Sequence, residues 1–224
     1  MGNARGLQRV AWLGALGGGL NATLCYLKWP VPVPGLGIDG PSTMHFHWSI
    51  IPGGCAHGAV LAAVPVWFAQ RLERHPIMTR WIAVPVIGWL SGWWSWSMMN
   101  ASMDLGGSGV IGALSVNFWK RVLWPFDGPL MSSDRLVAPF LYFGLVGVLL
   151  AAGVTLLSAS NFQRRPVAIT VGVASGVAGS LWWWSEWNRW WFSLLHGGMW
   201  GALVGYGLWM LHTDRDDLTA RGSA

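Results

Sequence analysis

The chain alternates between long apolar runs and short polar segments. Six runs of mostly apolar residues fall at approximately 10–29, 46–70, 81–103, 137–158, 167–186 and 190–212. A helix needs about 20 such residues to cross a hydrocarbon core about 30 Å thick. We therefore predict an all-α, polytopic integral membrane protein with about six transmembrane helices, built as a single domain over residues 1–224.

The segment 104–136, between the third and fourth runs, has a different character. Its central part reads VIGALSVNFWKRVLWPF, is only half apolar, and carries Lys120 and Arg121. It is too short and too charged to cross a bilayer. We expect an interfacial or re-entrant helix here.

Composition and charge support the membrane interpretation. The chain is 53% hydrophobic and 10% charged, whereas a soluble domain carries about 25% charged residues. The net charge of +5 comes from arginines in short segments between the runs, which favours a lipid bilayer over nucleic acid as the partner. The first run follows Arg5 and Arg9 as in a signal peptide, but it continues to Trp29 without a small-x-small cleavage site. We therefore expect a retained first helix.

The arginines also predict the orientation. With six spans, one side of the membrane receives Arg5, Arg9, Arg71, Arg74, Arg80, Arg164, Arg165, Arg215 and Arg221. The loops on the other side are close to neutral. The positive-inside rule then places both termini in the cytoplasm of a bacterium, with the chain crossing its cytoplasmic (inner) membrane several times.

Two stretches resemble each other. SIIPGGCAHGA, residues 49–59, and SLLHGGMWGA, residues 193–202, share a serine, two apolar residues and a glycine pair. The resemblance indicates two related helix pairs around a pseudo-axis, unless it arises by chance from glycine-rich membrane sequence. Glycines at spacings of three and four, as in GALGGGL and GVASGVAG, predict helices whose backbones approach closely.

Several kinds of chemistry are not indicated by any motif. The chain has no GxxxxGK[ST] phosphate loop, no HExxH zinc signature and no GxSxG nucleophile elbow. The two lysines, Lys28 and Lys120, lie at or beyond the ends of the runs, and no chain of carboxylates crosses them, so neither a Schiff base nor a proton relay is indicated. We leave open whether the chain is an enzyme, and we expect no catalysis by the chain alone.

Two histidines lie away from the ends of the runs and are the main candidate site residues. His57 and His196 are each followed by glycine, and Gly54, Gly58 and Gly197 surround them. A flat macrocycle bound through imidazole needs a neighbouring face without side chains. The two histidines, together or separately, are therefore candidate ligands of haem b or bacteriochlorophyll. The alternative is that each histidine only hydrogen-bonds to a neighbouring helix.

A second histidine pair precedes His57. His45 and His47 in STMHFHWS would point the same way in an extended segment, as ligands of Cu or Zn do. They fit equally well as polar anchors at the membrane surface. His57 follows His47 by ten helical residues, or about 15 Å. One metal therefore reaches both only if the helix starts later or breaks near Pro52.

Tryptophan is abundant, and it is concentrated toward the predicted outer side. The chain has 19 tryptophans, six of them in LWWWSEWNRWW, residues 181–191. Helical spacing places Trp89, Trp93 and Trp96 on one face of the third run, and Trp183, Trp187 and Trp190 on one face near the fifth. Such faces suit a ligand pocket, a wall against pigment, quinone or carotenoid rings, or a docking surface for other membrane subunits.

These patterns leave three functional hypotheses. The first is a non-catalytic or cofactor-contacting subunit of a bacterial respiratory or photosynthetic electron-transfer complex. The second is the substrate-binding membrane component of a small-molecule uptake transporter. The third is a small metal-dependent membrane enzyme built on His45, His47 and His57.

Overall fold

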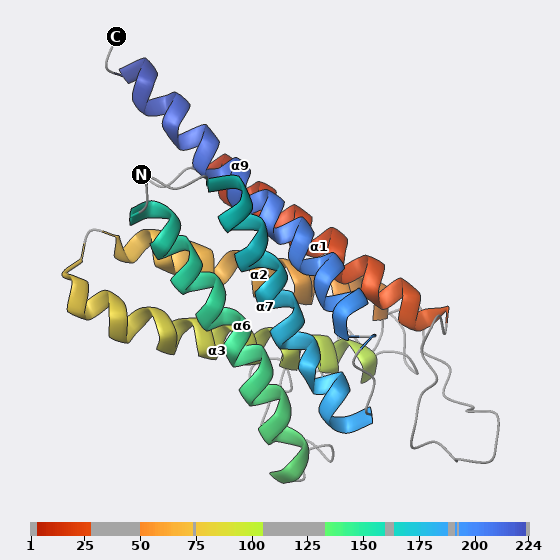
Figure 1. Ribbon diagram of the computed structural model, residues 1–224. Coiled ribbons are helices and arrows are strands. Elements are labelled where there is room, and N and C mark those ends of the chain that lie inside the picture. The colour runs from red at the N-terminus through yellow and green to blue at the C-terminus, as the bar shows by residue number, and fades with distance from the viewer. Residues whose placement is uncertain are drawn as a thin grey trace, which may run out of the picture.

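The computed structural model describes residues 4–27, 50–73, 75–104, 133–159, 164–187, 191 and 193–222. These residues form six α-helices and one short π-helix, and no strand occurs among them (Figure 1). The elements are α1 (Ala4–Tyr26), α2 (Ile50–Leu72), α3 (Ile77–Asp104), α6 (Ser133–Ala159), α7 (Arg164–Trp187), η2 (Ser193–Gly197) and α9 (Gly198–Gly222). Each of the six apolar runs overlaps one α-helix, so the predicted all-α class is confirmed for this part of the chain. Nearly all of the segment 104–136 lies outside the described residues.

Two of the helices are long and apolar enough to cross a membrane. They are the helices that contain Ile51–Leu72 and Leu141–Ser158. The other four α-helices are richer in glycine, serine and tryptophan, which lowers their apolarity. Helix α9 also continues ten residues past the apolar run that ends at residue 212. Its last turns carry charged residues, which an apolar-run criterion does not detect.

Prolines mark helix starts and also occur inside two helices. Pro52 lies in the first turn of α2 and Pro166 in that of α7, where a backbone N–H has no partner within the helix. Helix α2 therefore runs through Pro52 without a break. Pro65 and Pro85 lie in the interiors of α2 and α3, a placement that is tolerated when neighbouring helices surround the freed carbonyl.

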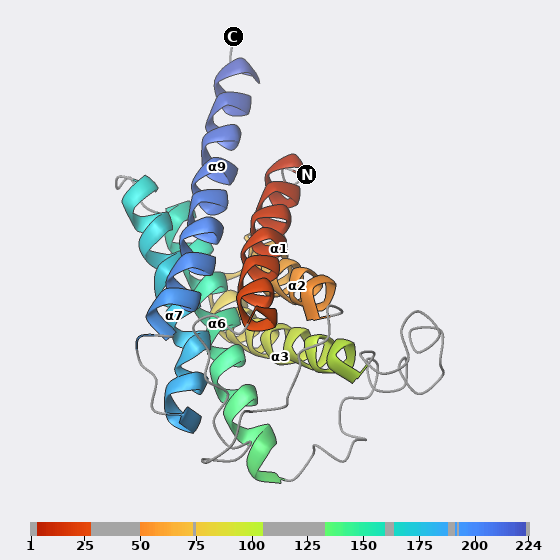
Figure 2. The ribbon, with the colours of Figure 1, turned by 90° about the vertical axis from the view of Figure 1, so that its right-hand side faces the viewer.

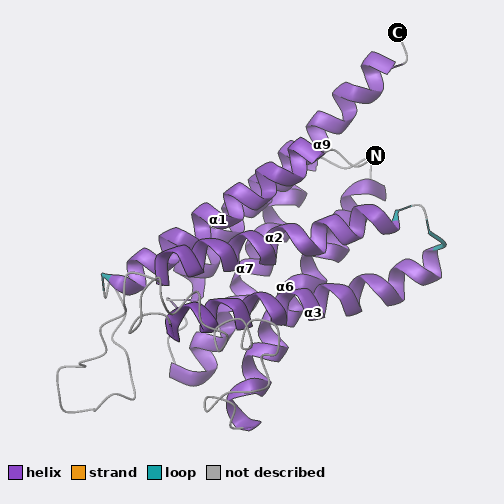
Figure 3. Ribbon diagram, turned by 180° about the vertical axis from the view of Figure 1, so that it is seen from behind, coloured by secondary structure: helices purple, strands orange, loops and turns teal. Residues whose placement is uncertain are grey.

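The six helices form a closed ring. In order around it, each of α1, α2, α3, α6, α7 and α9 contacts the next, and α9 contacts α1 again. Helices α2 and α6 also touch across the ring. Figure 2 shows α9 and α1 side by side, and Figure 3 shows the bundle from behind. The ring brings the first and last helices together and gives the bundle an interior.

Glycines hold three helix pairs together: α1 with α2, α3 with α6, and α7 with α9. In each pair two contacts lie one helical turn apart. These are Gly14 with Gly58 and Gly18 with Gly54, Gly88 with Gly147 and Gly92 with Phe143, and Gly172 with Gly201 and Gly176 with Gly197. A Cβ on the first-helix glycine of each contact would overlap a backbone carbonyl oxygen of the partner. Small residues thus let the backbones approach to a distance that larger side chains would prevent.

The three pairs are copies of one arrangement. The first helices carry the pattern glycine, two residues, small residue, glycine, two residues, and then Asn, Ser or Gly. The three copies read GALGGGLN (14–21), GWLSGWWS (88–95) and GVASGVAG (172–179). Burial repeats with the sequence, because Val10, Val84 and Ala168, four residues before each pattern, all lie in the core. The repeat is therefore threefold, whereas the sequence indicated two related helix pairs. It aligns Gly54 with Gly197 and Gly58 with Gly201, a register one residue away from the one that the sequence suggested.

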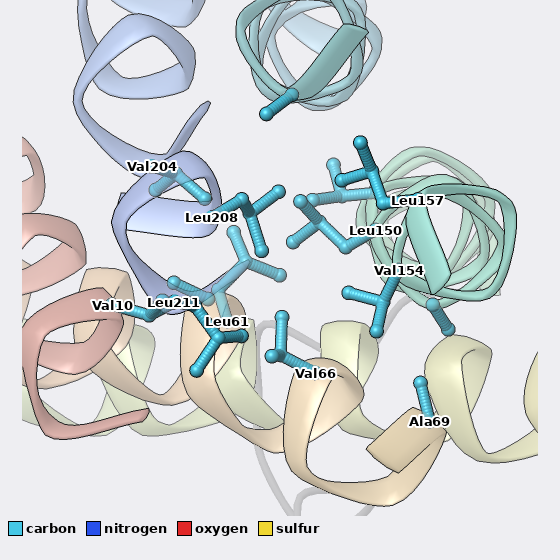
Figure 4. Close-up of a cluster of buried hydrophobic side chains, with 14 of the residues drawn as sticks. Val10, Leu61, Val66, Ala69, Leu150, Val154, Leu157, Val204, Leu208 and Leu211 are labelled. Atoms are coloured by element: carbon cyan, nitrogen blue, oxygen red, sulfur yellow. The ribbon is translucent and has the colours of Figure 1, made fainter. Parts of the chain in front are cut away.

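The second helices of the pairs supply the core. Equivalent positions of α2, α6 and α9 form two aliphatic layers, one of Leu61, Leu150 and Val204 and one of Pro65, Val154 and Leu208. Figure 4 shows the side chains of the three helices converging. Each of these residues is at least 95% buried. This half of the bundle is thus closed by packed aliphatic side chains.

Apolar side chains lie on the outer surface of the bundle as well as in its core. Helix α3 exposes an apolar stripe of Met78, Ile82, Val86, Leu90 and Trp94, each one turn apart over about 24 Å. The buried polar residues include Ser91, Ser95 and Ser175. Their hydroxyl groups donate to carbonyl oxygens of their own helices, at 2.9 Å to Gly88, 2.7 Å to Gly92 and 2.7 Å to Val171.

One end of the bundle, called here the basic end, gathers arginines. Both chain termini and the turn between α2 and α3 lie there, on the left of Figure 1. The Arg71 guanidinium lies 5.5 Å from the ring centre of Trp67, and the Arg165 guanidinium lies 4.9 Å from that of Trp209. Ser158 donates a hydrogen bond of 2.8 Å to Glu73, which ties α6 to the end of α2.

Candidate functional site

His57 is enclosed by three helices. It lies on α2 with 8% of its surface exposed. Its ring meets Phe143 of α6 edge to face, with ring centres 5.1 Å apart, and it interacts with the backbone of Ser95 on α3. Within the part of the chain that the structure describes, Nδ1 of His57 is buried without a hydrogen-bond partner. The imidazole therefore has one nitrogen available to a further group.

His196 lies in the π-helix η2, at the start of the last helix. It is 3% exposed. Its main-chain carbonyl oxygen accepts a hydrogen bond of 3.1 Å from the side-chain nitrogen of Asn21 on α1. Single π-helical turns are rare and often occur at functional sites, because they displace the backbone from the regular α-helical ladder. Here the π-turn coincides with the contact between the first helix and the last.

Trp200 and Asn21 both lie at the contact between α9 and α1, where Trp200 packs one turn from Asn21. Trp200 is 5% exposed, and its Cδ1 lies 2.9 Å from where a Cβ of Gly17 would be, one turn before Asn21 on α1. Within the described ranges, neither Nε1 of Trp200 nor Oδ1 of Asn21 has a hydrogen-bond partner, and both atoms are buried. One atom is a donor and the other an acceptor. The junction of α9 with α1 thus holds a complementary polar pair that is not bonded directly.

The two histidines contact different helices. His57 faces α3 and α6, whereas the backbone of His196 is bonded to α1 and its neighbour Gly197 packs on α7. The geometry therefore favours separate roles for His57 and His196.

The glycines beside the histidines are occupied by helix packing. Gly54 and Gly58 lie against α1, and Gly197 lies against Gly176 and Ser180 of α7. The side-chain-free faces that we assigned to a macrocycle are thus covered by other helices. Gly198 differs, since a Cβ there would meet nothing within 4 Å. The open backbone near His196 is therefore at Gly198.

The predicted aromatic wall is described only in part. Trp93 is half-buried on α3, and the ring of its neighbour Trp89 lies directly over Gly144 of α6. The side chains of Trp96, Trp183, Trp187 and Trp190, and both residues His45 and His47, lie outside the described part of the structure. Among the side chains that are described, no three of His, Cys, Asp and Glu gather as a metal site.

Comparison of equivalent positions in the three helix pairs shows where a polar group is not required for packing. His57, Val146 and Trp200 are equivalent, because they precede the equivalent residues Gly58, Gly147 and Gly201. Each points toward the next helix pair in the ring. In the middle copy, Val146 packs on Gly179 of α7, with its Cγ2 2.7 Å from the position of a Cβ. Two apolar residues therefore suffice to close such a junction.

Sequence reasoning missed four residues of these junctions: Asn21, Ser95, Phe143 and Trp200. Asn21 carried a signal, since it is the one amide side chain within the first apolar run. Trp200 was recognisable only as the residue that stands where His57 stands in the first copy, which requires the correct register. Phe143 and Ser95 become visible only with the helix contacts known.

Comparisons with protein-family models, with curated proteins and with solved structures find no match to this chain.

Proposed function

We propose that the chain is a multi-pass protein of the bacterial cytoplasmic membrane, with six helices that cross the bilayer and both termini in the cytoplasm. The apolar stripe of α3 supports this, because a row of exposed apolar side chains about 24 Å long suits lipid and not water. The arginines of the basic end support the orientation. The cation–π pairs Arg71–Trp67 and Arg165–Trp209 suit a membrane interface, where both side chains place polar tips in the headgroup layer.

Within that class we propose a ligand-binding role, as the substrate-binding membrane component of a small-molecule transporter. One observation carries this proposal: two of three equivalent junctions contain buried polar atoms without partners, whereas the third is closed by Val146 and Gly179. Polar groups inside a membrane protein are costly and usually mark ligand or ion sites. The fold does not need the polar atoms at these two junctions for packing. Their presence is consistent with recognition of a ligand.

The position of the junctions supports the same role. The layer of His57 and Trp200 lies one turn farther from the basic end than Leu61 and Val204, and two turns farther than Pro65 and Leu208. In the proposed orientation the polar layer is in the outer half of the bundle, and the aliphatic layers separate it from the cytoplasm. A ligand bound from outside needs the inner layers to part before it is released inward.

A second candidate is a cofactor-contacting subunit of an electron-transfer complex, with haem b or bacteriochlorophyll bound by a histidine and quinone or carotenoid rings against the tryptophans. The buried and unpartnered Nδ1 of His57 favours it, because a neutral imidazole nitrogen is a good metal ligand. The packing of Gly54, Gly58 and Gly197 against other helices weighs against a macrocycle at these glycines.

An absorption spectrum of the protein purified from its native membrane separates the two. A colourless preparation that retains or co-purifies with a small molecule or an ATPase supports the transport role. A haem or chlorin band that disappears in His57→Ala contradicts it and supports the cofactor role. His212→Ala is the matched control, because His212 is also buried but lies near the basic end.

A further inference from the structure

The junction of α9 with α1 offers one hydrogen-bond donor and one acceptor. Its geometry determines which atom of the Asn21 amide is the nitrogen and which is the oxygen. The side chain of Asn21 meets the carbonyl oxygen of His196, which can only accept. The amide nitrogen must therefore be the atom at 3.1 Å, and Oδ1 must point away from that carbonyl. The hydrogen bond thus holds Oδ1 ready as an acceptor.

Trp200 supplies the donor on the other side of the junction. Its indole packs against Gly17, one turn along α1 from Asn21, and its Nε1 is buried without a partner in the described structure. An indole nitrogen only donates. A buried donor and a buried acceptor left unbonded are costly, and the equivalent junction of Val146 with Gly179 shows that packing does not require them.

The surroundings define the charge of a partner molecule. Helix α1 has no charged residue after Arg9, and η2 with α9 has none before Asp214. An ion bound here would have no counter-charge on either helix. A neutral molecule that carries both a donor and an acceptor offers the hydrogen-bonding groups that Oδ1 and Nε1 lack.

We propose that Asn21 and Trp200 form a binding site for a small neutral molecule with an amide-, urea- or alcohol-type group, which donates to Oδ1 of Asn21 and accepts from Nε1 of Trp200. The site rests on the proposed ligand-binding function and names the substrate class. Water has the same hydrogen-bonding chemistry, so the test must distinguish water from an organic ligand.

The test uses the full-length protein in micelles, labelled with ¹⁵N at the tryptophan indoles. The Trp200 resonance is assigned by its loss in Trp200→Phe, which keeps an aromatic ring on Gly17. Acetamide, urea and methanol are titrated as probes that donate and accept, and N,N-dimethylacetamide is titrated as a probe that only accepts. Asn21→Leu removes the acceptor, and Ser175→Ala is the control, since the Ser175 hydroxyl bonds to its own helix.

We expect a saturable shift of the Trp200 resonance with at least one of the first three probes. The affinity should fall at least tenfold in Asn21→Leu and for N,N-dimethylacetamide, and should stay unchanged in Ser175→Ala. Circular dichroism and gel filtration confirm that each variant is folded.

The absence of a saturable shift with all three probes overturns the site, and so does an equal affinity in Asn21→Leu. A Trp200 indole proton that exchanges with D₂O but responds to no probe shows that water alone occupies the junction, which also overturns the site. The ligand-binding function survives separately if equilibrium dialysis shows a probe bound to Trp200→Phe but not to His57→Ala. Failure of both experiments removes the function and the site together.

Discussion

The side-chain nitrogen of Asn21 donates a hydrogen bond to the main-chain carbonyl oxygen of His196, a residue 175 positions farther along the chain. This bond joins the first helix to the π-turn that begins the last one. It closes the ring at one of the three junctions where no glycine pair joins the helices. The bond therefore has a structural role in addition to the orientation that it gives to Oδ1.

Loss of this bond should weaken the closure of the ring. We expect Asn21→Ala to lower the free energy of unfolding by about 1 kcal/mol, because interhelical hydrogen bonds in membrane proteins contribute about 0.6 kcal/mol on average and up to about 1.7. The measurement is unfolding by a graded mole fraction of SDS in mixed micelles. Thr23→Ala is the control, since the Thr23 hydroxyl bonds at 2.8 Å to Gly19 of its own helix. An equal loss in both variants would contradict the interhelical role.

The glycine contacts should be intolerant of any side chain. We expect Gly18→Ala, Gly92→Ala and Gly176→Ala each to destabilise the fold by about 1–3 kcal/mol, the usual cost of overpacking. The reason is that a Cβ would overlap a backbone carbonyl oxygen in every case. Gly198→Ala is the matched control, with no neighbour within 4 Å, and should change stability by less than about 0.5 kcal/mol. The three copies are not equivalent if only one of the three variants is destabilised.

The apolar stripe of α3 should face lipid. A spin label on Leu90→Cys, in a background without native cysteines, should be relaxed strongly by oxygen and weakly by a water-soluble nickel chelate. The same label on Val154→Cys should be shielded from both, because Val154 is fully buried. Strong relaxation of the Leu90 label by nickel would show that this face of the helix meets water.

The C-terminus should lie in the cytoplasm. A fluorescent protein fused after Ala224 should fluoresce in intact cells, and alkaline phosphatase at the same position should be inactive, because it needs the oxidising periplasm. The positive charge of the basic end is the physical cause. Active phosphatase at the C-terminus would reverse the orientation and would place the polar layer on the cytoplasmic side.

The sequence predicted the helices well but predicted their partners poorly. Apolar runs of about 20 residues show where helices form, because the chain must satisfy its own backbone hydrogen bonds in an apolar environment. A row of glycines on one helix face, in contrast, shows only that another group packs closely against that face. It does not show whether this group is a helix or a ligand. Gly54, Gly58 and Gly197 were assigned to a macrocycle for this reason, whereas the structure places helices there.

The middle copy of the repeat, formed by α3 and α6, could not be recognised in the sequence for a related reason. In α6 the position equivalent to Gly54 is Phe143, which meets Gly92 through its backbone carbonyl. The contact needs only one small residue, so the glycine pattern is lost on one helix while the geometry remains. The pairing of Asn21 with His196 was equally hidden, because nothing local connects residues 175 positions apart.

The helix pairs and the junctions between them differ in how easily they can move. Within a pair, backbone rests on backbone, and no side chain can change its rotamer to allow sliding. Between pairs, the contacts are made by side chains such as His57, Val146 and Trp200, which can rearrange. The bundle thus consists of three rigid helix pairs that are joined by adaptable side-chain contacts. Any opening of its interior must begin at the junctions that hold His57 and Trp200.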